Sequence, residues 1–296
     1  MAADFSTLRS LNANVTLSRR LGESSTLSAA YFYTHGLNIP VYFQSNLQLS
    51  GQRLADGRPV FNSIGYIDPR FANVLVARSV GQSSYNALAV TATRHLRSGL
   101  DLFASYTWSH AIDDAPEQNT IDGGVTQLPS DPSNLRRDRG DSLIDRRHAL
   151  TASAVWEPHI HAVPPVLAAI LRHNILSGIV TVYSGDKFDV GSNAIVNGDP
   201  TINSALQRPV FIGRNTYTGP PLCQLDVRYT RVVPLGERFR PEVLAEFTNL
   251  LNHDNIVGID TIAKVDRNGM ITKPPSFGWT SALDQRLTQI GLRLTF

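Results

Sequence analysis

Apolar and polar residues alternate along many stretches of this chain, and this alternation restricts its fold more than any other feature of the sequence. Successive side chains of a β-strand point to opposite faces, so a period of two gives each strand one apolar and one polar face. The segment GLDLFASYTW (99–108) places on one side the residues Leu100, Leu102, Ala104, Tyr106 and Trp108. Only residues 165–172 have a pattern that is compatible with a helix. The sequence therefore predicts an all-β fold.

The alternation predicts about nine strands. They are expected near residues 10–19, 25–35, 84–95, 99–110, 147–157, 173–184, 222–233, 238–250 and 286–296. The last strand, in the segment RLTQIGLRLTF, has as its alternating apolar residues Ile290, Leu292, Leu294 and Phe296. Strands of soluble proteins seldom run to a terminal aromatic residue, because chain ends usually fray. We expect this strand to take part in closing a barrel.

Short and long connections alternate between the predicted strands. The short ones lie at 21–25, 96–99 and 234–237, with a somewhat longer one at 158–172. The long ones are polar, rich in Gly, Pro, Asn and Asp, and lie at 36–83, 111–146, 185–221 and 251–285. Irregular loops beyond roughly 15 residues are uncommon in compact domains, whereas transmembrane barrels have short periplasmic turns and long extracellular loops. The pattern favours an antiparallel transmembrane β-barrel.

In such a barrel the apolar sides of the strands face lipid and the polar sides face a watery or plugged lumen. Aromatic girdles form at the two membrane boundaries, and the candidates here are Trp108 and Tyr106 near the outer end of one strand and Trp156 near the periplasmic end of another. Charged residues are tolerable on the lumen side. The lumen-facing charges that we expect are Asp226, Arg228, Arg240, Glu242 and Glu246.

Composition excludes several other classes. The net charge of +2 and the lack of a basic run argue against nucleic-acid binding. The single cysteine, Cys223, excludes an internal disulfide and a cysteine-rich metal site. No stretch reaches the ~20 apolar residues of a membrane helix, and the first residues do not have the order of a signal peptide.

Several segments together resemble the C-terminal part of TonB-dependent outer-membrane receptors, most closely the Oar-like branch, whose members often carry a carboxypeptidase-regulatory-like domain. The segments are SSYNALAVTATRHLRSGLDLFASYTWSHAID (83–113), NLRRDRGDSLIDRRHALTASAVWE (134–157), LSGIVTVYSGDKFDV (176–190), GRNTYTGPPLCQLDVRYTRVVPLGERFRPEVLAEFTNLLNHDN (213–255) and the terminal QIGLRLTF. The resemblance implies that the complete protein binds a scarce extracellular nutrient and imports it with energy delivered by TonB. It also implies that the barrel-assembly machinery reads the terminal Phe296, with Ile290, Leu292 and Leu294 before it.

Receptors of this kind have 22-stranded barrels with a plug in the lumen. The plug domain, the TonB box and the signal peptide lie upstream of anything in residues 1–296, so this chain is expected to be about the last nine strands of a longer receptor. An odd number of strands supports this expectation, because bacterial single-chain barrels have an even number. A gene fragment, a split gene and a misplaced start remain open. Alternatives are a small self-contained porin or structural barrel and, from another class, a soluble all-β secreted enzyme or adhesin.

The charged segment RRDRGDSLIDRRH (136–148) has two interpretations. One is a network of Arg–Asp pairs that stiffens the base of a loop, which the fork geometry of arginine favours. The other is a basic patch that captures a ligand.

Other polar clusters give weaker signals. An acidic group, Asp113, Asp114, Glu117 and Asp122, could bind calcium but lacks the spacing of a known calcium loop. His159 and His161 lack further metal ligands, and His110, His148 and Asp145 lack the G-x-S-x-G motif of a serine hydrolase. Asp226 with Glu242 or Glu246 could mimic a glycosidase pair, but Arg228 and Arg240 are expected to balance these charges. We therefore expect no enzyme activity, cofactor or metal, and as partners outer-membrane lipid, the assembly machinery and an unknown extracellular ligand.

Overall fold

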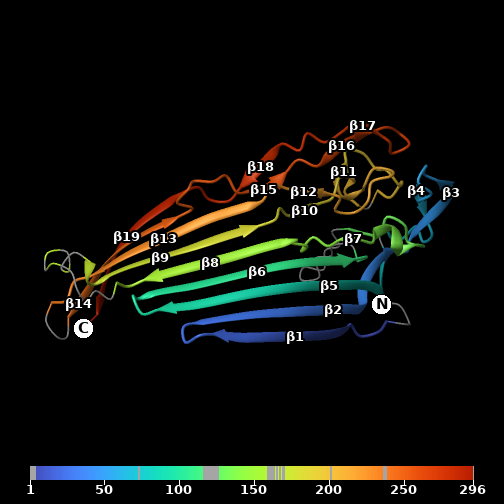
Figure 1. Ribbon diagram of the computed structural model, residues 1–296. Helices are drawn as coiled ribbons and strands as arrows, with labels where there is room; N and C mark the ends of the chain where they lie inside the picture. Colours follow the sequence, from blue (N-terminus) through green and yellow to red (C-terminus); the bar gives the residue numbers. More distant parts are fainter. Residues whose placement is uncertain are drawn as a thin grey trace.

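The main element of the fold is a sheet of nine long strands that lie side by side in chain order, each antiparallel to its neighbours (Figure 1). This computed structural model describes residues 5–72, 74–115, 127–158, 164, 166, 168, 171–200, 202–235 and 239–295. The nine strands are β1 (Arg9–Leu21), β2 (Ser25–Gln44), β5 (Leu75–Leu96), β6 (Leu100–Asp113), β8 (His148–Trp156), β9 (Asn174–Tyr183), β13 (Leu222–Val232), β14 (Arg240–Thr248) and β19 (Leu287–Thr295). A tenth short strand, β7 (Gly140–Asp141), pairs with β6 beside this path.

All nine predicted strands are confirmed. The largest difference is the length of β2 and β5, which span 20 and 22 residues. Their ladder continues from the predicted part to the pair Gln44 and Leu75, past an irregularity between Gly36 and Pro40. The alternation is lost there, and it is the pairing of the two strands with each other that keeps them extended. The segment 165–172, the single helical candidate, lies largely outside the described residues.

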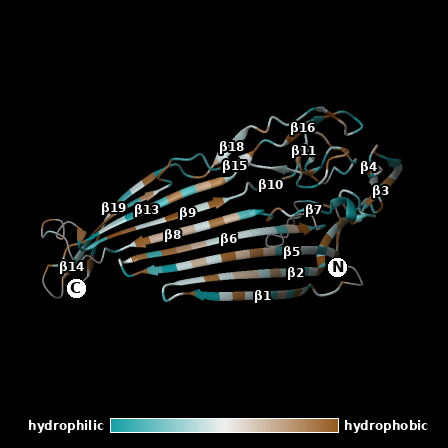
Figure 2. Ribbon diagram, in the orientation of Figure 1, coloured by the Kyte–Doolittle hydropathy of each residue, from teal (hydrophilic) through white to brown (hydrophobic). Residues whose placement is uncertain are grey.

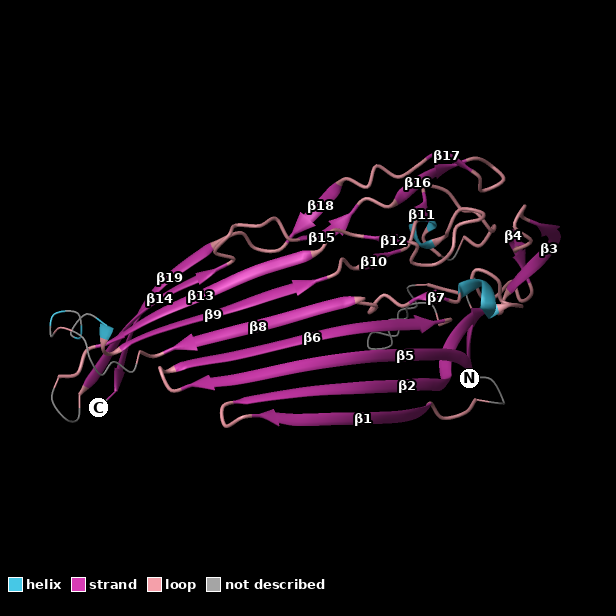
Figure 3. Ribbon diagram, in the orientation of Figure 1, coloured by secondary structure: helices cyan, strands magenta, loops and turns pink. Residues whose placement is uncertain are grey.

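The predicted alternation of short and long connections is also confirmed. Three-residue turns join β1 to β2 and β5 to β6, and Gly22 and Gly99 adopt the positive φ angles that these turns require, +70° and +81°. The long connections all lie at the opposite end of the sheet, and together they form what we call the loop layer (Figure 3).

The loop layer is more ordered than the sequence suggests, because it contains short strands of its own. They are β3 (Leu47–Arg53), β4 (Pro59–Tyr66), β10 (Lys187–Phe188), β11 (Gly191–Ser192), β12 (Tyr217–Thr218), β15 (Ile256–Ile259), β16 (Ile262–Val265), β17 (Ile271–Lys273) and β18 (Trp279–Ala282). Two short 3-10 helices, η1 (Leu135–Asp138) and η2 (Ser204–Leu206), complete it. β11 pairs with β16 in parallel, so connections that are far apart in the sequence are joined here.

The buried apolar residues gather in the loop layer and at the strand ends beside it. Among those described, Val41, Leu47, Phe61, Val196 and Ala263 are each at most 7% exposed. The middle of the sheet has no comparable core on either face within the described residues. A soluble sandwich would bury one face of its sheet, so this distribution separates the fold from that class.

The sheet is open. β1 pairs only with β2 and β19 only with β14 in the described part of the chain, so the two edges of the sheet do not meet. The fold is therefore a partial antiparallel barrel, as predicted. Among the described residues, no helix is long and apolar enough to cross a membrane.

Candidate functional site

One face of the sheet is apolar from the first strand to the last, and we call it the membrane face. The register sets the alternating apolar residues of neighbouring strands directly opposite one another. One row across six strands consists of Leu27, Ala92, Ala104, Ala152, Val180 and Leu225. The hydropathy colouring follows the same alternation along the strands (Figure 2). A one-residue slip in any strand would break this row, so the register itself selects a continuous apolar surface.

The large side chains of the membrane face are exposed. They include Leu17, Leu27, Tyr31, Leu88, Val90, Leu102, Tyr106, Trp108, Trp156, Leu176, Tyr229, Val243, Ile290, Leu292 and Leu294. Leu17 and Ile290 are 75% and 77% exposed. Leaving such a side chain in water rather than in an apolar phase costs about 1.5–3 kcal/mol. The membrane face therefore requires a large apolar environment.

The predicted girdle residues all lie on the membrane face. Trp108 stands opposite His148 at the loop end of β6, and Trp156 stands opposite Leu100 at the tight-turn end of β8. Tyr106 donates a hydrogen bond from its hydroxyl to Nδ1 of His148, at 2.7 Å, and the two rings stack. These aromatic residues thus occupy the two ends of the apolar band.

The last strand carries the predicted terminal signal on the same face. Ile290, Leu292 and Leu294 lie opposite Ala245, Val243 and Pro241 of β14. Phe296 lies outside the described residues. The three aliphatic residues extend the membrane face to the free edge of the sheet.

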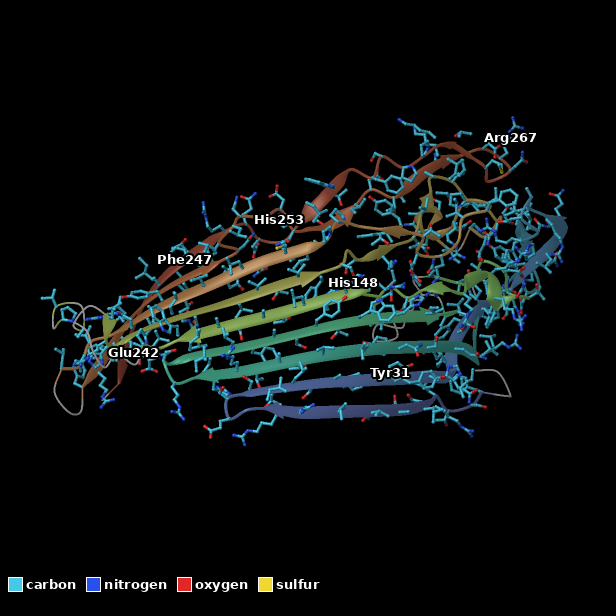
Figure 4. All side chains as sticks on the ribbon, in the orientation of Figure 1. Tyr31, His148, Glu242, Phe247, His253 and Arg267 are labelled. Atoms are coloured by element: carbon cyan, nitrogen blue, oxygen red, sulfur yellow. The ribbon has the colours of Figure 1, made fainter. Side chains whose placement is uncertain are left out.

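The five predicted lumen charges share the opposite face, where Arg228 lies across from Glu246. Nε of Arg228 is 2.5 Å from an oxygen of Glu246, and the carboxylate of Asp226 accepts hydrogen bonds from Gln224 and from the backbone N–H of Asn249. Figure 4 shows Glu242 at the tight-turn end of the sheet, far from the loop-layer residue Arg267.

One expectation about these charges needs correction. The guanidinium that pairs with Glu242 in the described residues belongs to Arg293 of β19, at 3.1 Å, and not to Arg240. Arg293 lies directly opposite Glu242 in the ladder, whereas Arg240 lies opposite Thr295. The sequence could not show this, because the pairing of β14 with β19 spans the long connection between them. Arg228 and Arg293 thus balance the two glutamates.

A network of ion pairs holds the base of the loop layer above β6 and β8. The buried Asp145 accepts the backbone N–H of Ala111 at 2.7 Å and pairs with Arg147 at 3.4 Å. Lys187 lies 2.7 Å from Asp141, which also contacts His110 at 3.0 Å. The network interpretation of residues 136–148 is thereby confirmed for this part of the segment.

The network sets the ionisation of Asp141. Burial favours the neutral form of this carboxyl, but hydrogen bonds and charge from Lys187 and His110 outweigh burial and lower its pKa. His110, Asp141 and Asp145 also lie close enough together to hold a metal ion. Lys187 and Arg147 already supply positive charge to both carboxylates, so the group is complete as an ion-pair network.

The remaining polar clusters are only partly described. Asp113 pairs with Arg214, and the carboxylate of Asp114 accepts the backbone N–H of Gln82. Burial raises the pKa of Asp114. Glu117, Asp122, His159 and His161 lie outside the described residues. Both described members of the proposed calcium group are therefore engaged within the protein.

The loop layer contains, among its described residues, two cavities of similar volume that the sequence does not predict. One, of about 290 Å³, is lined by residues that include Asp113, Ser142, Asp189, Arg214 and Asn215. The other, of about 300 Å³, is lined by residues that include Asp56, Arg58, Ser130, Arg137 and Arg208. Their walls come from connections that are far apart in the chain. Another hollow, of about 600 Å³, lies on the membrane face and is lined by residues that include Leu27, Ala92, Ala104, Ala152 and Leu225.

Comparison with known proteins points to the outer membrane. A family model described as "Outer membrane beta barrel domain" matches residues 1–213. No curated protein matches the sequence. The outer membrane transporter YddB from Escherichia coli is similar over 99% of this chain and 33% of its own, with 8% identity and a TM-score of 0.57. This likeness shows the fold alone.

Two further solved structures have TM-scores below 0.5. The ferric-catecholate import receptor Fiu from Escherichia coli K12 gives 0.47, at 12% identity over 100% of this chain and 29% of its own. FpvA from P. aeruginosa, bound to a pyoverdine and iron, gives 0.49, at 11% identity over 97% and 27%. The chain thus spans about a third or less of the length of each of these structures.

Proposed function

Because this chain belongs to the outer membrane beta barrel domain family, we propose that it supplies consecutive strands to the barrel of a longer TonB-dependent receptor. The chain is an outer-membrane β-barrel protein, and the continuous membrane face is the surface that contacts lipid. The observation that carries the proposal is the combination of this face with two sheet edges that have no pairing strand among the described residues. Backbone groups at an open edge have no water to bond in the hydrocarbon region, so spanning sheets are closed.

Self-closure is disfavoured by strand direction. In a meander of nine antiparallel strands, β1 and β19 run the same way, from the loop layer to the tight turns. Joining them would require a parallel pair, whereas bacterial barrels of one chain are antiparallel with an even strand count. Further strands of the receptor are the partners that complete the ladder at both edges.

The proposed activity of the complete receptor is import of a scarce nutrient with energy from the TonB system. The four long connections would supply contacts to the extracellular ligand, and the lumen face with Asp226, Arg228, Arg240, Glu242 and Glu246 would contact a plug domain. Trp108, Tyr106 and Trp156 would anchor the barrel at the two membrane boundaries. The assembly machinery would recognise the last strand through its alternating apolar residues Ile290, Leu292, Leu294 and Phe296. Assignment to the Oar-like branch belongs to the same proposal.

Cross-linking the two edges tests the proposal. In a Cys223→Ser background, cysteines replace Val15 of β1 and Ile290 of β19. The matched control pair replaces Ala245 and Ile290, which lie directly opposite each other in the ladder. We expect oxidation in outer membranes to join the control pair and to leave the edge pair unjoined. An efficient bond between the edges within one chain would instead establish a small closed barrel.

Import is tested in cells that produce the complete receptor. Uptake of its nutrient is expected to stop when TonB is deleted and to return when TonB is restored. Uptake that continues without TonB would contradict the energy coupling and favour a porin.

A further inference from the structure

The cavity of about 300 Å³ in the loop layer is lined by three arginines and one aspartate. Arg58 comes from the connection between β2 and β5, Arg137 from that between β6 and β8, and Arg208 from that between β9 and β13. Three positive side chains and one negative side chain therefore line this cavity. Three connections converge to build this cationic wall.

The arginines are held from behind by acids that do not line the cavity. Asp138, which is 1% exposed, pairs with Arg208 and also accepts hydrogen bonds from the backbone and hydroxyl of Ser130. Asp131, which is 2% exposed, lies 3.0 Å from Nε of Arg137. These contacts fix the guanidinium groups in place before any ligand arrives, which reduces the entropy lost on binding.

Two guanidinium nitrogens of the lining arginines have no hydrogen-bond partner among the described residues. Arg58 and Arg208 are 4% and 5% exposed, and the orphaned atoms are Nη2 of Arg58 and Nε of Arg208. The other contacts of Arg58 go to Asp56, at 2.7 Å, and to the carbonyl of Arg208, at 3.0 Å. A buried donor of a charged group without an acceptor is costly.

We propose that this cavity binds an oxyanion, namely a carboxylate or phosphate group of the extracellular ligand. Three guanidinium groups line the cavity, and such groups favour an oxygen acceptor over a cation or an apolar group. The planar fork of arginine suits both carboxylate and phosphate oxygens. Burial lowers the pKa of Arg58 and outweighs the opposing effect of Asp56.

The size of the cavity fits a small ligand or one acidic arm of a larger one, because ligand sites usually measure about 300–1,000 Å³. This inference rests on the proposed receptor function for its biological meaning. It also assigns a binding role to Arg137, one residue of the segment 136–148, while Arg146 and Arg147 belong to the ion-pair network.

The test is calorimetric titration of the complete receptor in detergent with two probes, citrate and inorganic phosphate. The variants are Arg137→Gln, whose side chain is one-third exposed, and Arg58→Lys, which keeps the charge but loses the fork. The matched control is Arg70→Gln in the same connection as Arg58, whose side chain is 78% exposed and pairs with Asp68. We expect both cavity variants to raise the Kd by about tenfold and the control to leave it unchanged.

Binding of citrate alone assigns a carboxylate ligand, and binding of phosphate alone assigns a phosphoryl ligand. The inference is overturned if the wild-type receptor binds neither probe. It is also overturned if the Kd of Arg137→Gln is no higher than the Kd of the control Arg70→Gln. This outcome is independent of the edge cross-link, so failure of this site and failure of the proposed function can be told apart.

Discussion

The face on which a residue lies determines what it can be replaced by. Val90 and Thr91 are neighbours in β5, but Val90 lies across from Ala29 and Tyr106 on the membrane face, whereas Thr91 lies across from Ser28 and Ser105. A single step along the strand thus moves a side chain from the apolar band to the polar face.

Val90→Arg is expected to lower the free energy of unfolding in lipid vesicles by about 2–4 kcal/mol, because the charge would enter the hydrocarbon region near its middle. Thr91→Arg, the matched control, is expected to cost clearly less, since its side chain enters the polar side. Denaturant titration followed by tryptophan fluorescence measures both. Equal losses at the two positions would contradict the assignment of faces.

The strands are the elements that the sequence predicts well, and the loop layer is the element that it does not. Alternation depends on neighbouring residues, so it locates all nine long strands, including the faces of Trp108 and Trp156. Strands of two residues such as β10 and β12 carry no such signal, because each exists only through pairing with the other, farther along the same connection. The cavity arginines show the same limit, since Arg58 bonds to the carbonyl of Arg208, 150 residues away.

The charged segment 136–148 is predicted in part, less well than the long strands and better than the rest of the loop layer. Its density of arginine and aspartate correctly predicts an ion-pair network, as the pairs of Arg147 with Asp145 and of Arg146 with Asp186 confirm. The segment cannot reveal the partner Lys187, which comes from another connection. Composition therefore predicts the kind of interaction, and the fold determines the partners.

The base of the loop layer is expected to loosen in acid. The pKa of Asp141 is lowered in the folded state, so its contribution to stability is complete above the unfolded pKa of about 4 and is lost as the pH falls through the folded value. Hydrogen exchange of residues 140–148 measures this loosening. The difference in protection between the wild type and Asp141→Asn should shrink below about pH 4, and a difference that stays constant down to pH 2 would contradict the network.

At the scale of the whole molecule, the two surfaces of the sheet and its two ends have separate roles. The membrane face meets lipid, the opposite face carries paired charges such as Arg228 with Glu246, and the loop layer holds the buried core and the cavities. The open edges at β1 and β19 leave room for further strands. This arrangement is stable only when the apolar band is immersed.

The three tryptophans test that claim most directly. Trp108 and Trp156 lie at the two ends of the membrane face, and Trp279 lies in β18 of the loop layer, 65% exposed. In single-tryptophan variants in vesicles of lipids with brominated acyl chains, fluorescence of Trp108 and Trp156 should be strongly quenched and that of Trp279 should not. Quenching of Trp108 and Trp156 by aqueous acrylamide, with none by the brominated lipid, would contradict a lipid-facing surface.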